Sequence, residues 1–379
     1  MRIALVAGAD AGHAFPAAAL AVRLARAGHR PVLVTAPRWL GALATAGIEA
    51  QPLPEFPPPA GSDFGYLIHG RAGEMAPALR THLGAIGPDL IVADLLAPAA
   101  ALAAELLDRP WVELVPHPLH LPSRALPPPG SGFAPGRTPL GRARDAILRR
   151  AAARSQAEGA AQRARARVSL GLPGPQSEPA ARLVATLPGL EPPRPDWPDR
   201  THVVGPLAWD PATTDLVPPE GSGPLVLVVP STASSGRSGL IEAALEGLTG
   251  VRLVGVQWEP YAGMLPSSAL VGTGRLAPLL EAADVVVAGG GHGLLSRALQ
   301  AGRPMVLVPG GGDQRDLARR VARAGAGIAV PRLTPGRLAR AVRTIVGRPS
   351  YAAAARRIAG RGQPEDPVRI CERAARGRG

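Results

Sequence analysis

Short apolar runs alternate with helical patterns along most of the chain, and this alternation limits the folds that the sequence can adopt. The run Ile3–Ala7 contains no polar residue, which is typical of a strand buried on both faces. A glycine-containing turn and a helical pattern follow it, and that pattern stops at Gly28, a residue suited to a left-handed C-cap. Strands separated by helices pair in parallel through right-handed crossovers. The sequence therefore predicts an open α/β sheet.

The alternation occurs twice, which indicates two similar α/β domains in tandem. A length of 379 residues fits this organisation. We expect an amino-terminal domain over residues 1–205, a proline-rich linker over 206–223, a carboxyl-terminal domain over 224–346 and final helices over 347–379. The expected strands are 3–7, 31–35, 89–93, 111–115, 225–229, 251–256, 284–288, 304–309 and 327–330. Residues 116–139 are expected to form a long loop, and residues 140–168 one or two helices.

Composition excludes several classes of protein. Every basic residue is arginine, so no lysine is present for Schiff-base chemistry or for a P-loop. The single cysteine, Cys371, excludes a disulfide framework and a cysteine-based metal site. An aromatic content of 3% argues against a stacking platform for nucleic acid, and none is expected as a partner. The net charge of +13 leaves open solvated arginine faces, an anionic substrate and an anionic membrane surface.

Targeting signals are not apparent in the sequence. No apolar run reaches the roughly 20 residues that a membrane span needs. The chain enters a strand-like segment directly after Met1-Arg2, without the layout of a signal peptide. We therefore expect a soluble, cytoplasmic protein without a transmembrane segment.

Ligands of open α/β sheets bind beyond the carboxyl ends of the strands, so the residues that follow each strand are the first candidates for a site. His13 follows the first strand at the start of a helix, and Asp94 follows the strand 89–93. A carboxylate on one imidazole nitrogen would leave the other nitrogen free to accept a proton from a hydroxyl. Two structural roles remain open, a backbone hydrogen bond for His13 and a helix N-cap for Asp94.

Three polar turns follow strands of the second half. A glycine-rich turn at 289–293 can direct backbone N–H groups and a helix dipole at a phosphate, although tight packing alone explains many such turns. Ser231-Thr232 and the segment 311–314 would lie at the same sheet edge. Asp313 in the last turn could hydrogen-bond vicinal hydroxyls of a sugar, and it could also cap the helix that follows.

These residues resemble the GT-B glycosyltransferases of family GT1, which include natural-product glycosyltransferases of actinomycetes. The amino-terminal resemblance lies in Gly12-His13-x-x-Pro16 and Gly28-His29. The carboxyl-terminal resemblance is more specific and covers 284–330. It comprises Asp284–Val287, the glycine turn, Arg297-Ala298-Leu299, Ala301-Gly302-x-Pro304, Val308-Pro309, Gly312-Asp313-Gln314 and Gly325-x-Gly327.

The resemblance implies two Rossmann-like domains with parallel sheets facing a central cleft, and an inverting sugar transfer from a nucleotide sugar to a small-molecule hydroxyl. His13 would be the general base and Asp94 its carboxylate partner. The acceptor would lie in the amino-terminal domain, with loops 56–70 and 116–139 as walls, and the final helices would cross back to that domain. The residues implied at the donor are Gly12, Ser231, Thr232, Arg275, Gly290, Gly291, His292, Gly293, Asp313 and Gln314.

The sequence departs from the family pattern at four places. Gly289 stands where the family has His, Leu294 where it has Thr or Ser, and Arg297 where it has Glu. Arg275-Leu276 falls near the place of a base-stacking Trp-Pro-Gln segment. We therefore expect helix N-termini, His292 or an arginine to bind the diphosphate, without an Asp-x-Asp metal site and without a cofactor. UDP, dTDP and GDP all remain open as the nucleotide.

Two alternatives to this function stay open, as does the oligomeric state. A transferase of lipid-linked or cell-wall precursors would use an apolar, basic surface at 140–168. A non-catalytic relative that binds a metabolite or activates a partner would explain Gly289 and Leu294. The sequence does not decide between a monomer and a homodimer.

Overall fold

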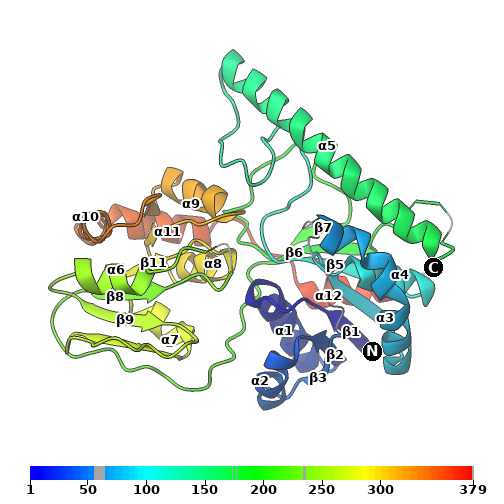
Figure 1. Ribbon diagram of the computed structural model, residues 1–379, viewed down its shortest axis with the longest axis horizontal. Coiled ribbons are helices and arrows are strands. Elements are labelled where there is room, and N and C mark those ends of the chain that lie inside the picture. Colours follow the sequence, from blue (N-terminus) through cyan, green and yellow to red (C-terminus); the bar gives the residue numbers. More distant parts are fainter. Residues whose placement is uncertain (55–64, 173, 176, 234–235, 378–379) are drawn as a thin grey trace.

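A computed structural model describes residues 1–54, 65–172, 174–175, 177–233 and 236–377. It contains two α/β domains that lie side by side (Figure 1). Each domain is built around one sheet, and all neighbouring strands in both sheets are parallel. The predicted α/β class with two parallel sheets is therefore confirmed. No helix within the described ranges is long and apolar enough to span a membrane.

The amino-terminal sheet has seven strands in the order β3-β2-β1-β4-β5-β6-β7. The chain adds strands in one direction from β1 and in the other direction from β4, so the order reverses between these two strands. Helices cover both faces, which is why the central strands are almost wholly apolar and buried. The strands are β1 (Arg2–Val6), β2 (Arg30–Thr35), β3 (Glu49–Pro52), β4 (Leu90–Asp94), β5 (Trp111–Val115), β6 (Ala181–Val184) and β7 (Thr201–Val203).

The helices of this domain form a layer on each face of the sheet. One core joins α1 to the sheet, and the other joins α3 and α4 to it. The chain leaves α1 through Gly28 at φ +83°, the left-handed conformation expected at that position. The helices are α1 (Ala11–Arg26), η1 (Pro37–Trp39), α2 (Leu40–Thr45), η2 (Tyr66–Gly70), α3 (Ala72–Ile86), α4 (Pro98–Leu106) and α5 (Pro139–Ser169).

The carboxyl-terminal sheet has six strands in the order β10-β9-β8-β11-β12-β13, with its reversal between β8 and β11. One core packs α8, α9 and α11 on the sheet, and a second core packs α6 and α10 on the opposite face. The strands are β8 (Leu225–Val229), β9 (Arg252–Val256), β10 (Ala269–Gly272), β11 (Val285–Ala288), β12 (Met305–Leu307) and β13 (Gly327–Ala329). The helices are α6 (Leu240–Gly247), α7 (Leu276–Ala282), α8 (His292–Gln300), α9 (Gln314–Arg323), α10 (Pro335–Val346), α11 (Ser350–Ala359) and α12 (Pro367–Arg376).

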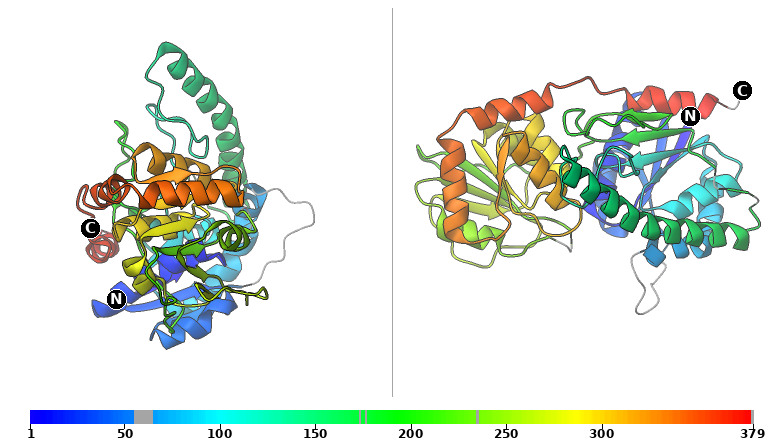
Figure 2. Two further views of the ribbon diagram at one scale, coloured as in Figure 1. Left: turned by 90° about the vertical axis from the view of Figure 1, so that its left-hand side faces the viewer. Right: turned by 90° about the horizontal axis from the view of Figure 1, so that it is seen from above.

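The chain returns to the first domain with its last helix, α12 (Figure 2). Ile370 and Cys371 of α12 are buried in the amino-terminal core, where the helix contacts α1, β5 and β6. The preceding helix α11 stays with the second domain and buries Ala355 and Ile358 there. The segment between α11 and α12 is therefore a second covalent connection between the domains.

The 140–168 segment forms one helix, α5, of 31 residues. Pro139 occupies its first turn, and the Thr138 hydroxyl accepts a hydrogen bond from the Gly141 N–H, so the amino-terminal end is well capped. The carboxyl-terminal half packs on η2 and α3, whereas the amino-terminal half stands out from the body of the molecule (Figures 1 and 2).

Candidate active site

The clearest candidate site lies where β1 and β4 end side by side, at the reversal in strand order. Val6 and Ala93 are register partners, so the residues that follow them emerge at the same sheet edge. His13 projects from the first turn of α1, and its Nδ1 lies 2.9 and 3.0 Å from the two carboxylate oxygens of Asp94. The Asp94 side chain has no exposed surface, and that of His13 is 17% exposed. With Nδ1 bound to the carboxylate, Nε2 is the nitrogen available to take a proton.

Asp94 is held in place by its own local structure. One of its carboxylate oxygens also accepts a hydrogen bond from the Leu96 N–H at 2.9 Å. Asp94 is the last residue of β4, and the N-cap of α4 is Ala97. The alternative role of Asp94 as a helix N-cap is therefore wrong, because three residues separate it from the first turn of α4.

The surroundings of His13 favour its charged form. Burial disfavours the imidazolium, but the hydrogen bond and negative charge of Asp94, with smaller contributions from Asp10 and Asp313, outweigh burial. They raise the pKa of His13 above its ordinary value of 6.5. Asp313 belongs to the other domain, so its effect shows that the donor-side turn lies near the candidate base. This dyad is thus a stronger base than an isolated histidine.

The opposite half of the site lies at the second reversal, between β8 and β11. Ser231 follows β8, and the glycine turn follows β11. A Cβ added at Gly289 would lie 2.8 Å from Cβ and 3.0 Å from the backbone nitrogen of Ser231. The position therefore has no room for the histidine that the resemblance places there. Gly290 has a φ of +90°, which favours glycine at the next position as well.

Gln314 joins two of the donor-side turns, its own and that of Ser231. Its side-chain amide donates to the Ser231 hydroxyl at 3.1 Å and accepts from the Gly310 N–H at 2.9 Å. Gln314 is only 3% exposed, so its amide connects the turns from the interior of the protein. Asp313 stands at the N-cap of α9, is exposed and makes no side-chain capping bond, which leaves its carboxylate accessible.

The other predicted donor residues lie on several elements of both domains. Gly291 and Gly293 flank the start of α8, and a Cβ at either would meet nothing within 4 Å. Thr232 is exposed beside Ser231, and Gly12 lies in the first turn of α1 next to His13. Arg275 lies at the N-cap of α7, in an exposed ion pair. That ion pair is with Asp215 of the linker.

His292 makes a contact between the domains. Its Nε2 lies 2.9 Å from the Thr186 hydroxyl of the amino-terminal domain, and the ring also hydrogen-bonds the Pro116 carbonyl. Burial, reinforced by the positive surroundings of His117 and Arg320, lowers the pKa of His292 to about 3. The imidazole is therefore neutral here and adds no positive charge at the start of α8. No sequence pattern pointed to Thr186 as a partner of this histidine.

A pocket of about 300 Å³ opens beside the donor turns. The carboxyl ends of β8 and β9 and the first turn of α6 line it. Arg237 lies in its wall and donates hydrogen bonds to the carbonyls of Pro309 and Pro331, so the pocket is fixed to the ends of the neighbouring strands. Its lining residues are Pro230, Ser231, Ala233, Gly236, Arg237, Ser238, Gly239, Leu240, Ile241, Glu242 and Gln257.

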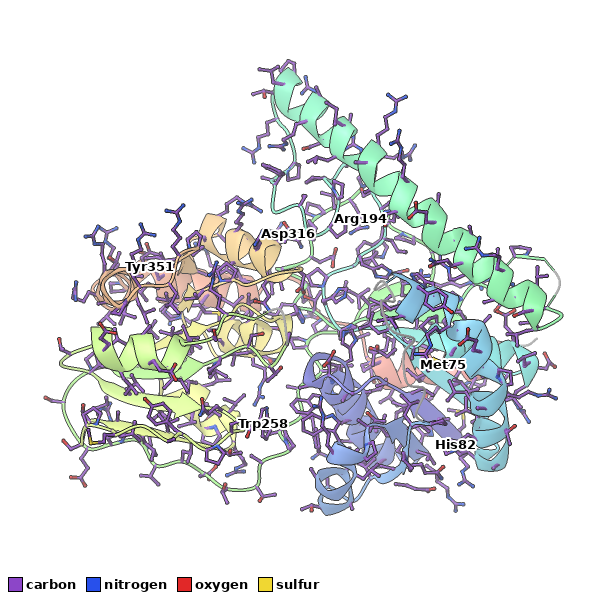
Figure 3. The ribbon with its side chains drawn as sticks, viewed as in Figure 1. Met75, His82, Arg194, Trp258, Asp316 and Tyr351 are labelled. Carbon is purple, nitrogen blue, oxygen red and sulfur yellow. The ribbon has the colours of Figure 1, made fainter. Side chains whose placement is uncertain are left out.

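Four aromatic side chains meet where the two domains approach one another. Phe15 packs edge-on against Trp39, Trp209 and Trp258, with ring centroids 4.8, 5.4 and 6.3 Å apart. Trp258 belongs to the second domain and lies on the side that faces the first (Figure 3). The loops expected to line an acceptor are described only in part, since 55–64 lies outside the described residues. No group of histidine, cysteine or acidic residues suited to a metal occurs in the part of the chain that is described.

Similarity to solved structures decides the fold. A glycotransferase of kitacinnamycin matches with a TM-score of 0.72 and 23% identity, over 99% of this chain and 95% of that one. The calicheamicin glycosyltransferase CalG4 has a TM-score of 0.69 at 22% identity, over 99% and 94% of the chains. VinC, whose structure contains dTDP, has a TM-score of 0.69 at 21% identity, over 99% and 100%. The chain has the GT-B fold.

Sequence comparison adds to the GT-B assignment. Residues 255–372 match the family model of the erythromycin biosynthesis protein CIII-like carboxyl-terminal domain. The 4′-demethylrebeccamycin synthase of Lentzea aerocolonigenes is 30% identical over 62% of this chain and 61% of its own. An O-mycaminosyltylonolide 6-deoxyallosyltransferase of Streptomyces fradiae is 33% identical over 48% of each chain. The chain thus spans about half to three fifths of these curated relatives. The resemblance to natural-product GT-B glycosyltransferases is confirmed.

The His13–Asp94 contact predicts how the ring titrates. We expect the pKa of His13 to lie above 6.5 in the wild-type protein and to fall in Asp94→Asn. The variant loses the charge that opposes burial, while burial itself remains. An NMR titration of the ring protons measures both values, with His13→Gln to assign the resonance among the 8 histidines. Equal pKa values in both proteins would contradict the assigned contact.

The crowding at Gly289 predicts that a histidine at this position, as in the family pattern, destabilises the folded protein. We expect Gly289→His to lower the free energy of unfolding by about 1–3 kcal/mol, because the new Cβ would force Ser231 to move. Gly291→Ala is the matched control and should change it by less than about 1 kcal/mol, since open space surrounds position 291. Denaturant unfolding measures both. A Gly289→His variant as stable as Gly291→Ala would refute this interpretation.

Proposed function

We propose that the protein transfers a sugar from a nucleoside diphosphate sugar to a hydroxyl group of a small natural-product acceptor. The observation that carries the proposal is the buried His13–Asp94 dyad at one strand reversal, close to Asp313 beside the other reversal. Both reversals are ligand-binding positions in open α/β sheets. The named relatives modify antibiotic scaffolds, which supports a small-molecule acceptor.

His13 would act as the general base. Its Nε2 removes the proton of the acceptor hydroxyl while that oxygen attacks the anomeric carbon of the sugar. The bond from the anomeric carbon to the diphosphate oxygen breaks on the opposite side, so configuration inverts and the nucleoside diphosphate leaves. Asp94 fixes the tautomer and stabilises the imidazolium that forms. General-base catalysis of this kind contributes about 10²–10⁴-fold to the rate.

The donor would bind at the second reversal. Backbone N–H groups of the glycine turn and the amino-terminal end of α8 favour an anion, and a diphosphate is the anion that leaves in this reaction. Ser231 and Thr232 add hydroxyl donors at the end of β8. Asp313 is accessible at the N-cap of α9 and would accept hydrogen bonds from sugar hydroxyls. VinC contains dTDP, which makes dTDP the first nucleotide to test.

Replacing the base tests the proposal directly. We expect His13→Ala to lower kcat by about 10²-fold or more, because no other group takes the proton, while dTDP binding stays within about twofold. Asp313→Ala is the companion variant and should weaken binding of a dTDP-sugar more than binding of dTDP. Single-turnover kinetics and calorimetry measure these effects.

Two results would oppose this function. A wild-type rate in His13→Ala would remove His13 as the base. If none of dTDP, UDP and GDP raised the melting temperature of the wild-type protein, nucleotide binding would fail, because a ligand of the folded state must raise apparent stability. That second result would favour a non-catalytic relative.

A transferase that acts on lipid-linked precursors is a second candidate, because α5 exposes an unusual surface. Leu140, Ile147 and Val168 are 84, 68 and 77% exposed, and they project from the same side of the helix. Arg150, Arg154 and Arg165 are also exposed on that side. Apolar and cationic side chains mixed along one helix face suit the surface of an anionic membrane.

Vesicle sedimentation tests the second candidate. If α5 binds membranes, the protein should sediment with phosphatidylglycerol vesicles but not with phosphatidylcholine vesicles, and more at about 0.1 M than at about 1 M salt, because salt screens the attraction. Arg150→Glu/Arg154→Glu should abolish binding. Arg337→Glu/Arg340→Glu makes the same charge change on α10 and should not. An equal loss of vesicle binding in both double variants, or no sedimentation of the wild-type protein, would count against this candidate.

A further inference from the structure

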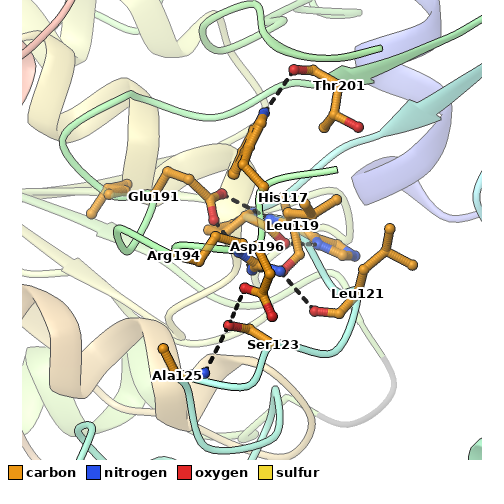
Figure 4. Close-up of polar contacts among 12 residues, drawn as sticks. His117, Leu119, Leu121, Ser123, Ala125, Glu191, Arg194, Asp196 and Thr201 are labelled. Atoms are coloured by element: carbon orange, nitrogen blue, oxygen red, sulfur yellow. Dashed lines mark hydrogen bonds and ion pairs between the residues drawn. The ribbon is translucent and has the colours of Figure 1, made fainter. Parts of the chain in front are cut away.

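The loop that follows β5, residues 116–138 and here named the strap, is fastened at its base to the segment 191–196 (Figure 4). Three charged side chains of that segment satisfy polar groups of the strap. The Arg194 guanidinium is almost fully buried and donates to two strap carbonyls at 2.8 Å each. The contacts are Glu191 with Leu119 N–H, Arg194 with the carbonyls of Leu119 and Leu121, and Asp196 with Ser123 Oγ and Arg124 N–H.

The tip of the strap reaches the other domain and binds α9. The Gly130 N–H donates to the Asp316 carboxylate at 2.9 Å, and Arg319 donates to the Gly132 carbonyl at 2.7 Å. The Arg319 guanidinium also lies 5.9 Å from the Phe133 ring centroid. Asp316 lies at the end of α9 nearest to the amino-terminal domain (Figure 3). The proposed acceptor domain thus makes polar contacts with the helix that begins at the donor turn.

The backbone of the tip is suited to this contact. Gly130 and Gly132 have φ values of +81° and +72°, a region that side chains strongly disfavour. A Cβ at Gly132 would lie 2.6 Å from an Arg319 nitrogen, so the guanidinium occupies the space that a side chain would need. On the other side, Arg144 of α5 lies 4.4 Å from the Phe133 ring and holds the tip against α5.

One face of α9 carries both the donor-side residue Asp313 and one of the two strap contacts, Asp316. Asp313, Asp316 and Arg320 follow one another at spacings of three and four residues, which places them on the same side of the helix. Arg320 donates to the Leu190 carbonyl at 3.3 Å. Asp313, at the start of this face, lies near enough to His13 to raise its pKa. A displacement of α9 would therefore move the donor turn and the strap contacts together.

We propose that Asp316 and Arg319 are positioning residues that hold the strap in register with the donor helix, so that the acceptor site is complete only when the donor occupies its site. This inference rests on the proposed function, in which the strap is a wall of the acceptor site. A nucleoside diphosphate bound at the turns joined by Gln314 fixes the start of α9, and α9 in turn fixes the strap. The donor then binds before the acceptor.

Labelling of a cysteine in the tip measures docking of the strap. Ser131→Cys places a thiol between the two anchored glycines, and the native Cys371 gives no background because it is fully buried and burial raises its pKa to about 12. With dTDP as the probe, we expect the maleimide labelling rate of Ser131→Cys to fall on nucleotide binding. Adding Arg319→Ala should raise the rate without nucleotide roughly tenfold, as expected for loss of a charge-assisted hydrogen bond.

The decisive readout is the effect of dTDP on the labelling rate of Ser131→Cys. It should disappear in Arg319→Ala. Because the coupling is reciprocal, calorimetry should give that variant a dTDP affinity lower than the parent's by no more than the factor by which dTDP slows labelling of the parent. Arg319→Lys should restore much of the effect, because an ammonium can still donate to Gly132. Arg323→Ala, an exposed arginine one turn further along α9, is the matched control and should behave as the parent.

Each outcome has a distinct meaning. If dTDP binds but changes the labelling rate in neither protein, or if Arg319→Ala and Arg323→Ala label alike, the coupling is refuted while the proposed function stands. If dTDP, UDP and GDP all fail to bind, the proposed function fails and the coupling fails with it. The comparison of Arg319→Ala with Arg323→Ala still decides whether the strap docks on α9.

Discussion

The contact between His13 and Asp94 is the interaction on which the proposed function depends, and it follows from the topology of the sheet. Strand order reverses between β1 and β4, so the ends of these strands are adjacent and the connections leave in opposite directions. The space left at that point admits a helix N-terminus carrying an imidazole. Asp94 is fully buried and accepts a hydrogen bond from the Leu96 N–H. Its carboxylate therefore holds and polarises the His13 imidazole.

The donor half uses the same topology with a different chemistry. Its turns are held together by the protein itself, since Gln314 links Ser231 to Gly310 and the Ser231 backbone fills the space beside Gly289. A preformed arrangement of backbone N–H groups loses little entropy when an anion binds. The glycine at 289 is therefore compatible with a donor site, because Ser231 occupies the volume that a side chain would take.

Much of the fold could be predicted from the sequence because buried parallel strands are continuous apolar runs. The strands β3, β6, β7 and β10 were not predicted, since they lie at or next to a sheet edge and have only three or four residues. All of them except β10 also contain a polar residue. Parallel register predicted that His13 and Asp94 lie close together, but it left their structural roles open beside the pairing. The neutral state of His292 was not predictable, because it depends on burial of the ring between the two domains and on the positive surroundings of His117 and Arg320.

The contacts between the domains explain why a loop of the acceptor side matters to the donor side. His292 with Thr186, the Phe15 aromatic cluster and the strap on α9 are three of the contacts that join the domains within the described residues. The strap ends on the helix that begins at the proposed donor turn, through the buried carboxylate of Asp316 and the exposed guanidinium of Arg319. The exposed Arg319 contact exchanges with water at little cost, whereas the aromatic cluster buries apolar surface. A change at the donor would therefore release the strap before it separated the aromatic rings.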